Sequence, residues 1–155
     1  MFPHDRGAVP LADGRTRFGV WAPAPDRLEL CLRRSRGVET IPMERDERGV
    51  AQVELENAGP GTEYWYRLDG ARDRPDPVSR ELAGGVHGVS RVVDPDAFRW
   101  TDGGWQGLAM PDLILYELHV GAFTPEGTFD AAIARLPYLL DLGVTALEIL
   151  SLIHI

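Results

Sequence analysis

The sequence predicts a mainly β protein in which a β-sandwich is followed by a single βαβ unit. In the first half of the chain, short apolar runs bounded by Gly, Pro, Asn or Asp recur at a spacing of roughly ten residues, which is typical of sandwiches. Further on, a strand pattern, a helical pattern and a second strand pattern follow one another. Two strands joined by a helix form a right-handed crossover with parallel strands. We therefore expect a sandwich and the beginning of a parallel α/β domain.

Five strands are predicted in the sandwich, at residues 16–21, 28–32, 39–43, 50–55 and 63–68. Pro42 has no backbone N–H and therefore favours an edge position for the third strand. Asp69 and Gly70 form a dipeptide that predicts a tight hairpin directly after the fifth strand. We expect residues 1–15 to form a loosely ordered lead-in and residues 72–91 to form a long irregular loop.

The second part is predicted as strand, loop, helix and strand, with the first strand, the loop and the last strand at residues 113–120, 121–127 and 144–150. Thr128 can cap the N-terminus of the helix, and Gly143 can end it in the left-handed conformation. Pro137 removes a backbone hydrogen bond inside the helix and should kink it. Three apolar residues at helical spacing predict its buried face, namely Ile133, Leu136 and Leu140.

Charge and composition exclude several classes of partner. The chain has 155 residues and a formal net charge of −8, and all 16 basic residues are Arg. Because an acidic protein is a poor match for phosphate groups, we expect neither a nucleic-acid nor a membrane partner. A neutral sugar needs no charge complementarity. No apolar run reaches the ~18 residues of a membrane helix, and no signal peptide is recognisable, so a cytoplasmic protein is expected.

Metal and cofactor sites are not predicted. Cys31 is the single cysteine, which leaves no internal disulfide and no thiolate metal cluster. The sequence also has no phosphate-binding glycine loop, no HExxH motif and no calcium-binding loop.

Four aromatic residues of the sandwich could stack on sugar rings, namely Trp21, Tyr64, Trp65 and Tyr66. Side chains alternate along a strand, so Tyr64 and Tyr66 share one face and Trp65 lies on the other. At least one of these faces must belong to the core, and we expect it to be the face of Trp65. Packing is the alternative role for all four residues.

The run LILYELHVGAFTPEGTFDAAIARLPYLLDLGVTALEIL at residues 113–150 resembles the start of the catalytic barrel in the maltooligosyltrehalose trehalohydrolases. This family belongs to the alpha-amylase superfamily, whose barrel is a (β/α)₈ TIM barrel. YELHVG alone would also fit glycogen branching enzymes. The longer pattern favours the trehalohydrolases.

The first part of the chain carries a matching resemblance. FGVWAPAPDRLELCL and GPGTEYWYRLDG resemble the early-set, immunoglobulin-like domain in front of the barrel in branching enzymes, isoamylases and trehalohydrolases. Related modules bind glycogen or starch. The segments PDP, GVHG and RVVDP resemble the trehalohydrolase linker and argue against a branching enzyme.

The resemblance implies three parts: an early-set, carbohydrate-binding-module-like β-sandwich at residues 1–95, a connector at 96–110 and a truncated start of the barrel at 111–155. The trehalohydrolases usually continue after TALEI with a Met-Pro step. Here residues 151–155 depart from that pattern, which indicates a truncated gene model with a foreign tail.

The resemblance also implies a function for the parent protein. It would hydrolyse the α-1,4 bond next to the terminal trehalose unit of maltooligosyltrehalose and release trehalose. Two alternatives remain: the N-terminal part of a 1,4-α-glucan branching enzyme, which transfers a glucan segment, or a non-catalytic glucan-binding module.

No catalytic residue is predicted within this chain. Retaining hydrolysis needs two carboxylates about 5–5.5 Å apart. The family takes its Asp nucleophile, its Glu acid and a second Asp from barrel strands four, five and seven, and none of them matches a residue here. The chain alone is therefore expected to be inactive. Glu117 and Glu148 lie on barrel strands without a predicted catalytic role. His119 is a candidate substrate-binding residue, with a structural hydrogen bond as the alternative.

Overall fold

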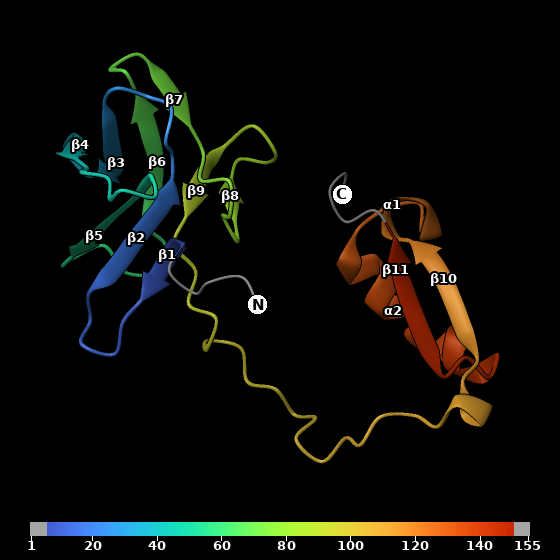
Figure 1. Ribbon diagram of the computed structural model, residues 1–155. Coiled ribbons are helices and arrows are strands. Elements are labelled where there is room, and N and C mark those ends of the chain that lie inside the picture. Colours follow the sequence, from blue (N-terminus) through green and yellow to red (C-terminus); the bar gives the residue numbers. More distant parts are fainter. Residues whose placement is uncertain (1–5, 151–155) are drawn as a thin grey trace. The chain divides into compact units, whose positions relative to one another are not determined.

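The computed structural model describes residues 6–150, so the tail at residues 151–155 lies outside the described part. The chain divides into two compact units, Met1–Arg99 and Trp100–Ile155. Figure 1 shows the first unit as two layers of strands and the second as a pair of strands with helices. The mainly β fold class is confirmed.

The first unit is a sandwich of two antiparallel sheets (Figure 1). The smaller sheet has the order β1-β2-β5, with β1 at Gly7–Pro10, β2 at Thr16–Trp21 and β5 at Val50–Leu55. The larger sheet has the order β4-β3-β6-β9-β8, and β7 pairs with β6. Its strands are β3 (Leu28–Arg34), β4 (Gly37–Pro42), β6 (Glu63–Leu68), β7 (Arg72–Arg74), β8 (Leu82–Ala83) and β9 (Val89–Arg91).

Two expectations about irregular segments are wrong. Residues 7–10 are not a loose lead-in, because β1 pairs along β2 from Gly7 opposite Gly19 to Pro10 opposite Thr16. Residues 72–91 contain the three short strands β7, β8 and β9. Strands of two to four residues are too short to show an alternating pattern, and their pairing depends on partners distant in sequence.

Two local predictions about the larger sheet are confirmed. Strand β4, which ends at Pro42, is an edge strand of this sheet. Asp69 and Gly70 have φ of 52° and 72°, and Leu68 pairs with Arg72 across the turn. This is the hairpin expected for a dipeptide that tolerates the left-handed region.

The sandwich core contradicts the expected orientation of the aromatic strand β6. Phe18 of one sheet meets Tyr64 of the other edge to face, with ring centroids 5.0 Å apart, and Tyr66 belongs to the same cluster. Trp65 therefore points to the outer face of its sheet, because side chains alternate along a strand. It is nevertheless only 5% exposed, with the Arg33 guanidinium 5.6 Å from its ring. The burial of Trp65 is confirmed, and its assignment to the core face is wrong.

The second unit is the predicted βαβ arrangement. Strand β10 (Leu115–His119) and strand β11 (Ala146–Leu150) are parallel neighbours joined through helix α2 (Phe129–Asp141). A short helix α1 (Val120–Phe123) follows β10 directly, where a loop was expected, and a 3₁₀ turn at Met110–Asp112 precedes the strand. No closed barrel is formed within residues 6–150.

Both ends of α2 follow the prediction. The Thr128 hydroxyl accepts the N–H of Ala131 at 3.3 Å, as an N-cap does. At the other end Gly143 has φ of 91° and donates to the carbonyl of Leu140, while Val144 donates to that of Leu139. These two bonds form a Schellman motif, which ends the helix.

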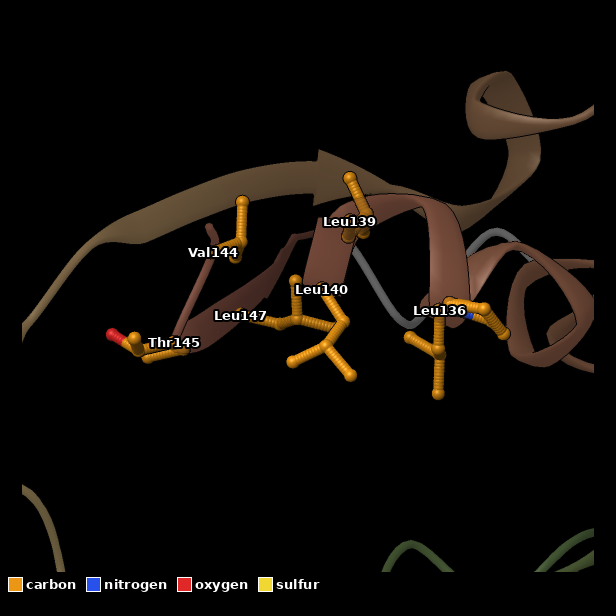
Figure 2. Close-up of a pocket in the computed structure, with 8 residues that line it drawn as sticks. Leu136, Leu139, Leu140, Val144, Thr145 and Leu147 are labelled. Atoms are coloured by element: carbon orange, nitrogen blue, oxygen red, sulfur yellow. The ribbon is translucent and has the colours of Figure 1, made fainter. Parts of the chain in front are cut away.

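The buried face of α2 differs from the prediction. Leu139 packs with Leu118 and Val120, whereas Ile133, Leu136 and Leu140 are exposed. Figure 2 shows Leu139 directed toward β10 and Leu136 and Leu140 directed away from it. The prediction is wrong because apolar side chains occupy a wide part of the circumference of α2, and the two strands β10 and β11 cover only the part that carries Leu139. The helix continues across Pro137 to Asp141.

Candidate functional site

The first candidate region is the face of the β10-β11 pair that lies opposite α2. Tyr116 and Leu118 pack toward α2, so Glu117 and His119 belong to the other face of β10. Glu117 is in register with Glu148 on β11. This face thus gathers the polar groups of both strands.

His119 lies at the carboxyl end of β10 and immediately precedes α1. Its side chain is half-buried, and Nδ1 is buried without a hydrogen-bond partner within residues 6–150. A Cβ on Gly121 would lie 3.0 Å from Cε1 of His119, so the imidazole packs over a position that suits glycine. The alternative of a structural hydrogen bond therefore has no support at Nδ1 in the described part of the chain.

Glu117 and Glu148 form an acidic pair rather than an acid and a nucleophile in a closed site. Both side chains are exposed, and they are direct neighbours across the parallel strands. Like charges in this arrangement repel each other. The described residues place no basic side chain in an ion pair with either glutamate.

The second candidate region is on the sandwich. Tyr64, Trp65 and Tyr66 are each at most 5% exposed, so they cannot stack on a ligand without local unfolding. Trp21 is 54% exposed. Of the four aromatic residues considered from the sequence, Trp21 alone presents a ring to solvent.

Trp21 lies beside a polar groove at one end of the smaller sheet. Its indole N–H donates to the carbonyl of Arg48 at 3.0 Å, and the next residue, Ala22, donates its N–H to the carbonyl of Gly49 at 2.9 Å. The groove has a volume of about 390 Å³ and is lined by residues 23–26 and 45–49. No sequence pattern predicts this groove, because its two walls are far apart along the chain.

The walls of this groove are held by side-chain to backbone hydrogen bonds. The guanidinium of Arg45 donates to the carbonyls of Ala22, Pro23, Pro25 and Asp26. On the other wall, the Asp46 carboxylate accepts the N–H groups of Val50 and Arg48, both at 2.9 Å. These bonds hold the pKa of Asp46 below its usual range.

Residues 6–95 match the family carbohydrate-binding module 48, described as the isoamylase N-terminal domain. The chain belongs to the carbohydrate-binding module 48 family. The matched range covers the two sheets of the sandwich and the segment that carries β7, β8 and β9, so the immunoglobulin-like assignment of this unit is confirmed.

The similarity of the chain extends beyond this module. It is 44% identical over 147 residues to the malto-oligosyltrehalose trehalohydrolase of Deinococcus radiodurans, covering 94% of this chain and 24% of that enzyme. It is also 44% identical over 140 residues to the enzyme of the same name from Saccharolobus solfataricus, covering 90% of this chain and 24% of the relative. The resemblance found in the sequence is confirmed. The chain spans about a quarter of the length of these curated relatives.

A solved structure described as a putative alpha amylase from Salmonella typhimurium has a TM-score of 0.85 and 39% identity to this chain. The match covers 96% of this chain and 25% of that one. A type I pullulanase of Bacillus subtilis, solved in complex with maltose, has a TM-score of 0.77 and 25% identity to this chain. That match covers 97% of this chain and 24% of the pullulanase chain.

The branching-enzyme alternative has weaker support. A 1,4-alpha-glucan branching enzyme of Xanthomonas oryzae is 32% identical over 155 residues, covering 87% of this chain and 21% of the relative.

Metal-binding clusters and membrane-spanning helices are absent from the described part of the chain. No group of three potential metal-binding side chains occurs within residues 6–150. None of the helices described there has the length and apolarity needed to cross a membrane.

Proposed function

We propose that this chain is the N-terminal part of a maltooligosyltrehalose trehalohydrolase. The longer enzyme hydrolyses the α-1,4 bond next to the terminal trehalose unit of maltooligosyltrehalose and releases trehalose. One observation carries the proposal: the 44% identity to an enzyme of that name runs over 147 residues, through both the sandwich and the βαβ unit. The carbohydrate-binding module family alone would fit many glucan-active enzymes.

In this proposal each part of the chain has its own role. Residues 1–95 are the carbohydrate-binding module, residues 96–110 are a connector, and residues 111–155 begin the catalytic barrel. The exposed apolar groove between α2 and β11, lined by Leu136, Leu140 and Leu147 (Figure 2), would be covered by later elements of the barrel. The substrate is a neutral α-1,4-glucan carrying a trehalose end, and the proposed location is the cytoplasm.

His119 is proposed to contact the substrate. Barrel enzymes of this type bind substrate at the carboxyl ends of their strands, and His119 ends β10. The residue is only half-buried, so part of it remains accessible, and an imidazole nitrogen can form a hydrogen bond with a sugar hydroxyl. The residue is a binding residue in this proposal, because bond cleavage requires a carboxylate pair at about 5–5.5 Å.

The chain of 155 residues is proposed to release no trehalose by itself. A closed barrel takes about 250 residues, and this chain spans 24% of the length of its relatives. The two glutamates on β10 and β11 are neighbours on open strands, without the closed cleft that orients a sugar ring and excludes water.

The test uses the longer protein read from the same gene. Incubation with maltotriosyltrehalose should release trehalose, measured by anion-exchange chromatography. New α-1,6 branch points in amylose, without trehalose release, would instead establish the branching enzyme. No activity on either substrate, together with retention on glycogen, would establish the binding module.

The role of His119 is tested in the same protein. His119→Ala should lower kcat/KM by about tenfold or more, mainly through a higher KM, because a lost hydrogen bond weakens substrate binding. His87→Ala is the matched control, since His87 is an exposed loop histidine of the sandwich unit. Equal kinetics for the two variants would contradict a substrate contact at His119.

A further inference from the structure

We propose that residues 75–81 form a strap between the two sheets of the sandwich that opens and closes as one unit on the buried side chain of Asp76, and that mild acid favours its closed state. The strap joins β7 to β8. The inference concerns the sandwich unit by itself. It goes beyond the proposed function and does not depend on it.

The strap contacts both sheets of the sandwich. On the larger sheet, the Asp76 carboxylate accepts the Tyr64 hydroxyl of β6, and the Asp76 N–H donates to the Ser90 hydroxyl of β9, both at 2.8 Å. On the smaller sheet, the Arg80 guanidinium donates to the carbonyl of Ala8 at 3.3 Å. Ala8 belongs to β1, which is an edge strand of that sheet. The closed strap therefore links the edge of one sheet to the aromatic strand of the other.

A single buried residue holds the strap in place. Asp76 is 3% exposed, whereas the other six residues of the strap are exposed or half-buried. Val78 lies against β1, where a Cβ on Gly7 would be 3.3 Å from its Cγ2, yet Val78 is 48% exposed. A segment without a buried apolar side chain opens at a lower free energy than the core. The hydrogen bonds of Asp76 therefore carry most of the attachment.

The backbone of the strap is organised around the same residue. The Val78 N–H donates to the Asp76 carboxylate at 2.9 Å, and the Ser79 N–H donates to the Asp76 carbonyl at 3.1 Å. Pro75 and Pro77 on either side of Asp76 have no backbone N–H and add no bond of their own. Three amide hydrogen bonds of the strap thus involve Asp76, so they become accessible to water together when its side chain leaves the core.

Few titratable groups face the Asp76 carboxyl. Strand β6 presents Tyr64 and Tyr66, and burial raises the pKa of both phenols, so they stay neutral at physiological pH. The strap itself presents Arg80, whose guanidinium keeps its positive charge. Strand β9 presents the uncharged hydroxyl of Ser90, and β1 presents backbone to the strap. Among these groups, Asp76 is therefore the one that changes its charge between acid and neutral pH.

The charge of Asp76 sets the direction of the pH effect. Burial raises the pKa of its carboxyl above the ordinary value of 3.8 and outweighs the Val78 N–H, the Tyr64 hydroxyl and Arg80, which lower it. Opening exposes the carboxyl to water and restores the ordinary pKa. The closed strap thus binds the proton more tightly than the open one. This stabilisation is fully present below the ordinary pKa and is lost as the pH rises through the raised one, so opening should be more frequent at neutral pH.

The test measures amide hydrogen exchange of the chain of 155 residues by NMR at pH 4 and pH 7. The opening constants of the Asp76, Val78 and Ser79 amides should agree within about twofold and exceed that of Phe18, in the central strand β2, by about tenfold or more. They should be about threefold or more larger at pH 7 than at pH 4. Strap amides that exchange no faster than Phe18, or at unrelated rates, would overturn the strap. Equal or smaller constants at pH 7 would overturn the effect of acid.

Three variants separate the anchor from its charge. Asp76→Asn removes the titrating group, so the opening constants should lose their pH dependence. Ser90→Ala removes the acceptor of the Asp76 N–H but keeps the carboxyl, so opening should be about two- to tenfold more frequent with the pH dependence retained. Asp73→Asn is the matched control, because this neighbouring carboxylate is 48% exposed and pairs with Arg67.

A pH dependence in Asp76→Asn equal to that of the unmodified chain would overturn the role of Asp76. So would its loss in Asp73→Asn. The exchange rates of the unmodified chain decide the proposal even if Asp76→Asn does not fold. The outcome is also independent of whether the longer enzyme releases trehalose, so the strap and the proposed reaction fail separately.

Discussion

The hydroxyl of Tyr64 donates a 2.8 Å hydrogen bond to the carboxylate of Asp76, and both residues are buried. The other carboxylate oxygen of Asp76 accepts the N–H of Val78 at 2.9 Å, and the Asp76 N–H donates to the Ser90 hydroxyl at 2.8 Å. Asp76 thereby attaches the segment between β7 and β9 to the aromatic core. Burial raises the pKa of the Asp76 carboxyl above its ordinary value.

Tyr64→Phe should lower the free energy of unfolding by about 1–3 kcal/mol at pH 7, because it leaves a buried carboxylate oxygen without its donor. The Tyr64 hydroxyl favours the ionised form of Asp76. Removing the hydroxyl should therefore lower the free energy of unfolding most at pH values at which Asp76 is ionised. The penalty should therefore be fully present above the raised pKa of Asp76 and should shrink as the pH falls through it. Urea unfolding at neutral and mildly acidic pH measures both effects.

Tyr66→Phe is the control for this prediction. The Tyr66 hydroxyl is buried and has no hydrogen-bond partner within residues 6–150, so removing it should change stability by less than about 0.5 kcal/mol. An equal loss for both variants, or a Tyr64→Phe loss that is the same at both pH values, would contradict the assigned role of the Tyr64–Asp76 bond.

Gly49→Ala should lower the free energy of unfolding of the sandwich by more than the cost of placing alanine in the left-handed backbone conformation. Gly49 has φ of 78°, which costs a non-glycine residue about 1–2 kcal/mol. Its new Cβ would in addition press against Pro23 at 2.8 Å. Gly14→Ala is the matched control, because Gly14 has φ of 85° and a Cβ added there would meet nothing within 4 Å. Equal unfolding free energies for the two variants would show that the groove walls can separate freely.

Prediction from the sequence was most accurate where the structure of a segment depends on residues that are close to it in the sequence. Strands β2, β5 and β6 begin and end at the predicted residues, because each has one core face and alternation marks it. The turn at Asp69 and the helix end at Gly143 were predictable from residues that tolerate positive φ. The short strands β7, β8 and β9 were missed because long-range bonds such as Asp76 to Ser90 hold that segment.

The alternation of side chains shows which residues of a strand share a face, but it does not show which face points into the core. This is why Trp65 was assigned to the wrong side: Tyr64 and Tyr66 meet Phe18 across the sandwich, a contact that depends on the second sheet. The candidate sites show the same limit. The position of His119 at a strand end was predictable from its sequence context, whereas the exposure of Trp21 and the groove beside it arise from the packing of two distant loops.

Trp65→Ala should cost about 3 kcal/mol, the low end of the range for emptying a buried aromatic site. Trp65 is 5% exposed, but it lies on the outer face under the Arg33 guanidinium, which can move into the space left behind. Phe18→Ala, at a fully buried position between the sheets, should cost about 5 kcal/mol. A loss below about 1 kcal/mol for Trp65→Ala in urea melts would place the indole in solvent and restore it as a candidate sugar platform.

The two units should differ strongly in their resistance to protease. The sandwich buries a large apolar cluster between two sheets. The buried cluster of the βαβ unit consists of Leu118, Val120 and Leu139, while Ile133 and Leu140 are 60% and 73% exposed. A two-stranded sheet with open edges is marginally stable by itself. Local opening should therefore be far more frequent beyond residue 111 than in the sandwich.

Limited trypsin digestion followed by mass spectrometry tests this difference at two arginines. Arg135 is exposed on α2, with its guanidinium 5.0 Å from the Tyr138 ring. Arg67 lies on β6, which is paired on both sides, and its side chain bonds Asp73 at 2.7 Å. Cleavage after Arg135 should occur early and cleavage after Arg67 late, because a protease needs locally unfolded backbone. In the longer enzyme, the closed barrel should protect Arg135. If Arg135 survives as long as Arg67 in the chain of 155 residues, the βαβ unit is stable without the rest of a barrel, and its exposed apolar groove must be covered by another surface of this chain.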